Sequence, residues 1–173
     1  MDVFFDPDLT PATMRHAFGA FPTGVTAIAG LVDAAPVGLA ANSFTSVSLD
    51  PPLASVCISV ASTTWPRLRR SGRLGISVLS HDQQDACRRL AARGVDRFAG
   101  LAWQATREGA VVLPGASAWF DCSIQQEIRA GDHEVVLLAM HRLGRDTRVR
   151  PLVFHGGRFR RLAESETDRD DER

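Results

Sequence analysis

Residues 39–53 read Leu-Ala-Ala-Asn-Ser-Phe-Thr-Ser-Val-Ser-Leu-Asp-Pro-Pro-Leu, and this stretch decides how the chain is interpreted. It reads as an apolar strand that ends in small polar residues, followed by a turn at Asp50-Pro51-Pro52 and a second apolar strand. Small side chains leave backbone N–H groups accessible, and Asn, Ser and Thr add hydrogen-bonding groups of their own. The stretch therefore predicts a polar edge where a ligand approaches the backbone closely.

The composition bounds the class of protein. The chain has 173 residues and is 45% apolar, which suits one globular domain with its own core. Twenty acidic residues balance twenty basic ones, so no charge excess favours nucleic acid or an anionic membrane as a partner. All the basic residues are arginine, and tyrosine is also absent. A Walker-type phosphate loop, a Schiff-base lysine and a Tyr-Lys reductase pair are therefore excluded.

The cysteines and the first residues bear on location. Cys57, Cys87 and Cys122 are widely spaced and form no CxxC pair, so we expect free thiols in a reducing compartment. The chain start lacks the basic and long apolar segments of a signal peptide, and no segment has the length of a membrane span. We expect a cytoplasmic protein.

The rest of the chain reads mainly as short strands. The clearest hairpin joins residues 118–128, which alternate apolar and polar side chains, to residues 133–140 through Gly131-Asp132. Because regular strand–helix alternation is missing, the pattern favours a closed or nearly closed antiparallel barrel. Further strands are expected at 25–31, 37–44, 53–60, 74–79 and 152–159, and helices beginning at Thr10-Pro11, at Thr63 and at Ser80 or Asp82.

Two polar segments follow strands that we expect to be neighbours in the sheet. Ala41 to Ser48 is the first, and Ser62-Thr63-Thr64, at the start of a predicted helix, is the second. Hydroxyl groups at a helix N-terminus favour phosphate binding. Together the segments suggest one elongated ligand that carries a phosphate, although a polar edge strand ending in a loop would have the same composition.

The remaining candidates have structural alternatives too. His133 follows the Gly131-Asp132 turn and is either a ligand-binding residue or a solvated turn histidine. Arginines 88, 89, 93 and 97 read as the solvated face of a helix, from which a minority can reach a phosphate. The histidines form no HExxH pair, so no metal site is expected. GxGxxG and GxSxG motifs are absent, which argues against a Rossmann turn and an esterase elbow.

Four motifs, taken in order, resemble those of the short-chain flavin reductase family with the FMN-binding split-barrel fold. Members of this family supply reduced flavin to two-component monooxygenases. The resemblance covers residues 10–162 as one domain, between an N-terminal extension (1–9) and a charged tail (163–173) that we expect to be disordered. The motifs are Phe21-Pro22-Thr23-Gly24-Val25-Thr26, Asn42-Ser43-Phe44-Thr45-Ser46-Val47-Ser48-Leu49-Asp50-Pro51-Pro52, Asp96-Arg97-Phe98-Ala99-Gly100 and Gly131-Asp132-His133.

The resemblance implies a mainly β fold, an antiparallel split β-barrel with two or three flanking helices. It also implies FMN or FAD as the flavin, NADH or NADPH as the hydride donor, and a homodimer with the flavin cleft at its interface. His133 would face the nicotinamide, and Phe98 would lie near the flavin. The isoalloxazine and ribityl chain would be lined by Ala41, Asn42, Ser43, Phe44, Thr45, Ser46, Val47 and Ser48, and the phosphate held by Ser62, Thr63 and Thr64.

One departure from the family pattern is Arg89-Leu90-Ala91, where members often have Arg-Phe-Ala, and the choice between FMN and FAD stays open. The implied reaction passes a hydride from the nicotinamide to the flavin, and it depends on the positioning of two rings. We expect the reduced flavin to reach a partner monooxygenase by diffusion. Two alternatives keep the fold: a flavoprotein that reduces another acceptor, and a flavin-binding protein without reductase activity.

Overall fold

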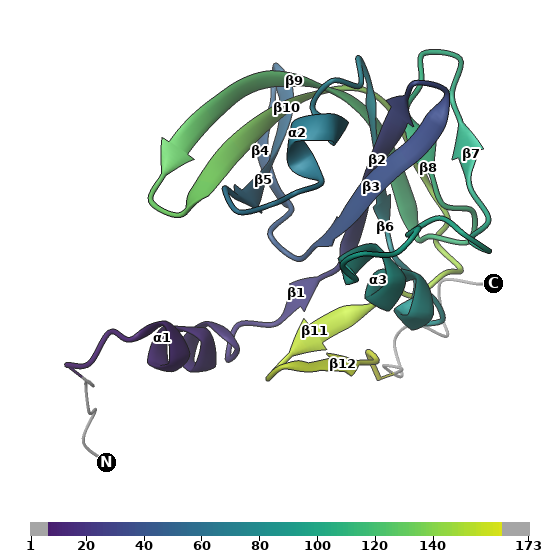
Figure 1. Ribbon diagram of the computed structural model, residues 1–173. Helices are drawn as coiled ribbons and strands as arrows, with labels where there is room; N and C mark the ends of the chain where they lie inside the picture. Colours follow the sequence, from purple (N-terminus) through teal and green to yellow (C-terminus); the bar gives the residue numbers. More distant parts are fainter. Residues whose placement is uncertain (1–6, 164–173) are drawn as a thin grey trace.

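The computed structural model describes residues 7–163 and has a mainly β architecture (Figure 1). Residues 1–6 of the expected N-terminal extension and residues 164–173 of the expected charged tail therefore lie outside the described residues. The elements are α1 (Pro11–Phe18), β1 (Thr23–Gly24), β2 (Thr26–Val32), β3 (Ala35–Ala41), β4 (Thr45–Leu49), β5 (Pro52–Ser59), α2 (Trp65–Leu68), β6 (Leu74–Val78), α3 (Gln84–Ala91), β7 (Gln104–Ala105), β8 (Val111–Val112), β9 (Ala118–Ala130), β10 (His133–Arg145), β11 (Val153–His155) and β12 (Arg158–Arg160).

Seven strands form one sheet in the order β3-β2-β6-β9-β10-β5-β4, and every pairing in it is antiparallel. Smaller sheets are formed by β1-β11-β12 and by β7-β8. The prediction of an antiparallel, mainly β fold with flanking helices is confirmed. Among the described residues, no helix is long and apolar enough to span a membrane.

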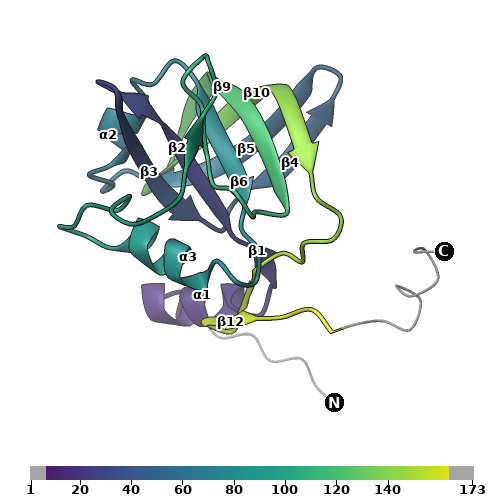
Figure 2. The ribbon, with the colours of Figure 1, turned by 90° about the vertical axis from the view of Figure 1, so that its right-hand side faces the viewer.

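A three-residue connection closes the large sheet into a barrel. Strands β3 and β4 are its two outermost strands, yet only residues 42–44 join them. In a flat sheet of seven strands the outer two lie about 29 Å apart, whereas this connection spans at most about 14 Å. The sheet therefore has to curl until its edges meet, and Figure 2 shows β2 and β3 on one side of the barrel with β4 and β10 on the other.

Where the edges meet, the side chain of Ser43 bridges to β5. Its hydroxyl accepts a hydrogen bond from the Cys57 N–H at 2.9 Å and donates one to the Cys57 carbonyl at 3.1 Å. Thr45 pairs with Ser55 in the β4–β5 ladder, so Ser43 stands opposite Cys57 at the next such position. We call this contact the seam. At the seam a hydroxyl makes the hydrogen bonds that the backbone makes elsewhere in the ladder.

The barrel interior is filled by branched side chains from the alternating positions of its strands. Trp65 and Leu68 of α2 are buried against this cluster. A second cluster lies on the other face of β2, beneath α3, which contributes Cys87 and Leu90. α1 has no buried residue and extends from the barrel beside β1 (Figure 1). The fully buried residues of the interior are Ile28, Val56, Leu68, Leu74, Ile76, Cys122, Val136 and Leu138.

Several predicted boundaries were wrong. The strand expected at 37–44 ends at Ala41, because the chain crosses to the opposite edge of the sheet and begins β4 there. For the same reason the strands bearing the two polar segments, β3 and β5, are not neighbours in the ladder order. The helix expected to begin at Thr63 is the single turn α2, and the strand expected at 152–159 is the β11–β12 hairpin.

The cap expected at Ser80 or Asp82 was also wrong. Helix α3 follows Gln83, which makes no side-chain cap to the helix. Instead the Gln83 side chain accepts a hydrogen bond from the Ser80 N–H at 3.0 Å and donates one to the Pro114 carbonyl. Because this amide ties the start of α3 to the loop before β9, packing rather than capping sets where the helix begins.

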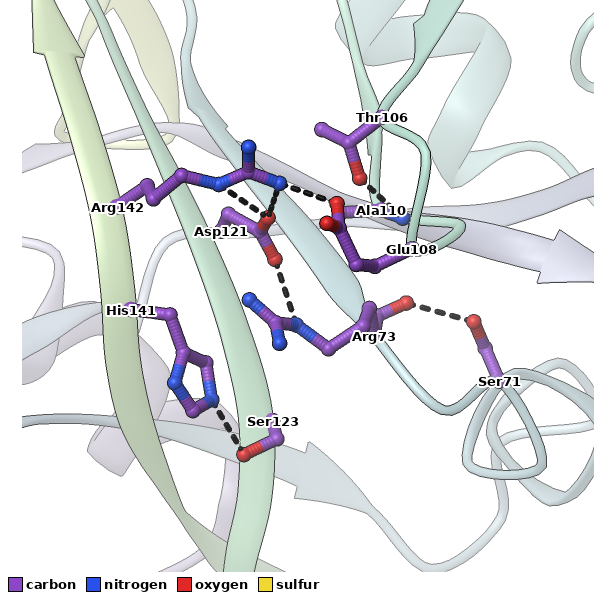
Figure 3. A network of polar contacts seen from close by, with 9 residues as sticks. All are labelled: Ser71, Arg73, Thr106, Glu108, Ala110, Asp121, Ser123, His141 and Arg142. Atoms are coloured by element: carbon purple, nitrogen blue, oxygen red, sulfur yellow. Dashed lines mark hydrogen bonds and ion pairs between the residues drawn. The ribbon is translucent and has the colours of Figure 1, made fainter.

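A buried carboxylate joins strands that are distant in sequence (Figure 3). Asp121 of β9 is only 5% exposed, although the alternating pattern places it on the polar face of the strand. Arg73, just before β6, donates to one carboxylate oxygen at 2.8 Å, and Arg142 of β10 donates to the other at 2.9 Å. Arg142 also pairs with Glu108 in the β7–β8 turn. One carboxylate thus ties together β6, β9, β10 and the β7–β8 turn.

A β-bulge is what brings Arg142 to this carboxylate. The register shifts between Met140 and Arg142, so that Met140 pairs with Cys122 and Arg142 pairs with Asp121. His141 is the extra residue, and its imidazole is hydrogen-bonded to the Ser123 hydroxyl at 2.8 Å. Without the inserted residue, Arg142 would stand one position further along β9.

We expect Asp121→Asn to lower the free energy of unfolding by about 2 kcal/mol, because hydrogen bonds to charged groups contribute about 1.5–3 kcal/mol, Arg73 loses its carboxylate partner and Arg142 keeps only Glu108. Urea denaturation measures the change. Asp33→Asn is the matched control: Asp33 is exposed at a turn with φ of 52°, a conformation that asparagine tolerates. Its effect should stay within about 0.5 kcal/mol. Equal stability of the two variants would contradict a structural role for Asp121.

Candidate functional site

A cleft of about 300 Å³ lies beside the seam. One wall is the end of β3 and the connection that follows it, residues 39–43, and the adjoining wall is residues 57–59 of β5. Residues 61–63, before α2, form a third side. The end of α3 and the loop after it contribute Leu90, Ala91, Arg93 and Arg97, and the β9–β10 hairpin contributes His133. The cleft thus gathers four parts of the chain that are far apart in the sequence: residues 39–43, 57–63, 90–97 and 133.

The wall at the seam is built from small side chains. Ala40 and Ala41 present methyl groups, and the Ser43 hydroxyl is already engaged with Cys57. A flat ring can therefore lie close to the backbone here, with the Asn42 amide beside it as a donor and acceptor. This matches the close approach expected from the small residues of the sequence.

The segment expected to line a flavin divides at the seam. Ala41, Asn42 and Ser43 line the cleft. Phe44 turns toward the barrel interior and stacks on Phe120 with ring centroids 5.4 Å apart. The other predicted residues of this segment belong to β4 and do not line the cleft: Thr45, Ser46, Val47 and Ser48.

The second polar segment lies across from the first. Ser62 and Thr63 line the cleft, and Thr64 lines a second cavity next to it. The Ser62 hydroxyl accepts a hydrogen bond from the Trp65 N–H at 3.1 Å. Since α2 has only four residues, its dipole is small, and an anion here depends on the hydroxyls and nearby arginines.

Phe98 does not line the cleft. Its ring is buried against β3, where a Cβ added to Gly38 would lie 3.0 Å from the ring. Arg97 holds this loop to β3 by donating to the Gly38 carbonyl at 3.0 Å and to the Ala92 carbonyl at 2.8 Å. Burial, and secondly the charge of Arg93, lower the pKa of Arg97. The Asp96-Arg97-Phe98 motif therefore positions the loop that carries Arg93.

His133 begins β10, and its side chain is 44% exposed at the edge of the cleft. Its Nδ1 lies 2.7 Å from a carboxylate oxygen of Asp132. The hydrogen bond from His133 is the main cause that lowers the pKa of Asp132. An ionised carboxylate only accepts, so Nδ1 carries the proton in this pair and Nε2 is left for a ligand.

Sequence reasoning did not name Asp132 as a site residue, and it did not single out Arg93 among the four arginines of which a minority can reach a phosphate. Asp132 could have been recognised from its position directly before His133, but we interpreted Asp132 only as a turn residue. Among the four arginines of the α3 region, Arg88 pairs with Asp85, and Arg89 donates to the Ala99 carbonyl. Arg93 lines the cleft, and within residues 7–163 it makes no ion pair.

The residues of the cleft fit a flavin nucleotide. The volume of the cleft is at the lower end of the range for small-molecule sites, and the cleft is open to solvent on the side of His133. Small residues provide a surface for the ring system, while hydroxyls and an arginine are suitable for a phosphate. No group of three or more His, Cys, Asp or Glu side chains in the described region is arranged to hold a metal ion.

Comparison with known proteins gives relatives along most of the chain. A probable flavin reductase of Rhizobium meliloti (strain 1021) is 46% identical over 129 residues, which cover 73% of this chain but only 41% of that protein. The reductase subunit HsaB of a flavin-dependent monooxygenase of Rhodococcus jostii (strain RHA1) is 37% identical over 87% of this chain and 77% of its own length.

A solved structure of the NADH:FAD oxidoreductase SgcE6 of Streptomyces globisporus C-1027, in complex with NAD and FAD fragments, superimposes with a TM-score of 0.87. It is 36% identical and matches 95% of this chain and 99% of that chain. The family model described as flavin reductase like domain matches residues 18–163. This chain therefore belongs to the flavin reductase like domain family.

Proposed function

We propose that this chain is an NAD(P)H:flavin oxidoreductase that supplies reduced flavin to a partner monooxygenase. The observation that carries the proposal is the convergence on one cleft of the 41–43 segment, Thr63, Arg93 and His133. Relatives support the reaction class, since one is a monooxygenase reductase subunit and another is an NADH:FAD oxidoreductase solved with NAD and FAD fragments.

When bound, the flavin accepts a hydride at N5 from C4 of the nicotinamide. The chain's contribution is to position the two rings and to polarise their surroundings. Residues 41–43 hold the flavin ring against the seam, while Thr63 and Arg93 hold its phosphate. Phe44 in the connection and Thr45 to Ser48 in β4 support that wall, and Phe98 supports the loop that carries Arg93.

His133 orients the nicotinamide in this proposal. With Nδ1 donating to Asp132, Nε2 is left to hydrogen-bond with the carboxamide group of the donor. Asp132 keeps the imidazole in one tautomer and one orientation. Neither residue has to transfer a proton, because the hydride passes directly between the rings.

We further propose that the reduced flavin leaves by diffusion and that the protein acts in the cytoplasm. The exposed side of the cleft at His133 supports flavin exchange. The three cysteines are free thiols, which suits a reducing compartment.

Purified protein should oxidise NADH or NADPH only when free FMN or FAD is added, because the flavin is a substrate that enters and leaves. Absorbance at the nicotinamide band measures this, with cytochrome c as an acceptor for the reduced flavin. Protein that copurifies with flavin and does not oxidise either nucleotide would refute the reductase function.

We expect His133→Ala to raise the KM for the nicotinamide nucleotide about fivefold to tenfold and to lower kcat, since one positioning hydrogen bond is lost. Flavin affinity should be unchanged, because the wall at the seam and the side chains that bind the phosphate remain. Steady-state kinetics and equilibrium dialysis measure the two quantities. His16→Ala, on the exposed face of α1, is the control. Unchanged kinetics in His133→Ala would remove this residue from the site.

We propose that two copies of the chain form a homodimer that shares the flavin cleft. β4 is an outermost strand of the sheet, and it exposes Val47 and Leu49, the latter 91% exposed. Unpaired edge strands with apolar side chains favour association. Light scattering should give the mass of a dimer, and a monomer that still reduced flavin would refute the shared site.

A further inference from the structure

We propose that a second cavity next to the cleft binds the adenylyl phosphate of a dinucleotide flavin, so that the chain takes FAD in preference to FMN. Arg67, on α2, is the residue that makes this distinction. The inference rests on the proposed function and names the substrate of the same site.

The two cavities share one border. The second cavity has a volume of about 480 Å³. It lies between the first residues of β3, 35–38, and the loop 93–98. Thr63, Arg93 and Arg97 line both cavities. Arg67 and Thr64 line only the second. A ligand longer than the cleft can therefore pass from one to the other beside Thr63.

The second cavity has an excess of positive charge. Arg67, Arg93 and Arg97 line it, against a single carboxylate, that of Asp96. The Asp96 carboxylate accepts a hydrogen bond from the Phe98 N–H at 3.0 Å, and Arg97 is bound to two carbonyls of the chain. Within residues 7–163, Arg67 and Arg93 make no ion pair. Two guanidinium groups are thus available to an anion.

The covalent structure of the flavin matches this arrangement. In FAD the second phosphate is joined to the first through one bridging oxygen, so it has to lie directly beside the first. If Ser62 and Thr63 contact the first phosphate, the second falls at the shared border, toward Thr64 and Arg67. Guanidinium groups bind phosphate oxygens in a bidentate geometry. FMN ends at the first phosphate and leaves these contacts unmade.

The experiment measures binding rather than turnover, by equilibrium dialysis of FAD, FMN and riboflavin against purified protein. Unaltered protein should bind FAD more tightly than FMN. Arg67→Gln should weaken FAD binding about tenfold, the effect of one lost hydrogen-bonded charge contact, and leave FMN and riboflavin within about twofold. Arg93→Gln, which touches both cavities, should weaken FAD and FMN but not riboflavin.

Arg70→Gln is the matched control. Arg70 lies three residues after Arg67, is exposed, pairs weakly with Asp33 at 3.9 Å and lines neither cavity. It should leave the binding of all three flavins unchanged. If it weakened FAD as much as Arg67→Gln does, general electrostatic attraction would explain the effect and the proposed contact would be wrong.

Three further results would overturn the inference. Equal weakening of FMN and FAD by Arg67→Gln would place the first phosphate in this cavity. No effect on either would remove Arg67 from the site. A change in the NADPH to NADH ratio of KM values, with flavin affinities unchanged, would assign the cavity to the 2′-phosphate of the hydride donor. Protein that bound the flavins as expected but oxidised no nicotinamide nucleotide would refute the reductase function and leave the inference standing.

Discussion

The fold depends on a length constraint at residues 42–44. These three residues join the outermost strands of a seven-stranded sheet, and they can do so only when the sheet is curled. Part of the same connection forms a wall of the cleft, so this wall takes shape only when the barrel closes. Ser43 serves both, because its hydroxyl completes the edge of β5 while its small size keeps the wall open to a ring.

The long β9–β10 hairpin connects the interior of the barrel to the edge of the cleft. Near one end, Asp121 and the bulge at His141 fix its register against β6 and the β7–β8 turn. At the other end the hairpin turns through Gly131, with φ of 64°, and presents His133. A second register shift, between Leu137 and Leu138, lies between these points. The same two strands therefore carry the electrostatic contact in the barrel and the side chain at the site.

Local patterns in the sequence were sufficient for the class of fold and for the hairpin. Alternation along residues 118–128 and the Gly131-Asp132 turn predicted β9 and β10. The resemblance to the flavin reductase family implied one site for Ala41 to Ser43, Ser62, Thr63 and His133, and these residues line one cleft. The division of the 41–48 segment was not predictable locally, since Phe44 and β4 follow from a crossing between sheet edges that are distant in the ladder. Asp121 was missed for a similar reason: its burial comes from partners 48 and 21 residues away. In the sequence Arg93 could not be distinguished from Arg88 and Arg89, because the difference lies in the partners that those two arginines have in the structure.

The short tether at the seam has a consequence for how the site adapts. Because this wall is held by a three-residue connection and two hydrogen bonds, it is rigid and already formed before a ring binds. Binding there therefore costs little free energy of reorganisation. Accommodation of longer or shorter nucleotides has to come from the facing loop, where Gly94 has a φ of 71° and a Cβ added to it would meet no heavy atom within 4 Å. Differences in nucleotide preference among proteins built this way should accordingly arise on that loop and at the Arg67 position of α2, which lines the same cavity, while the seam stays the same.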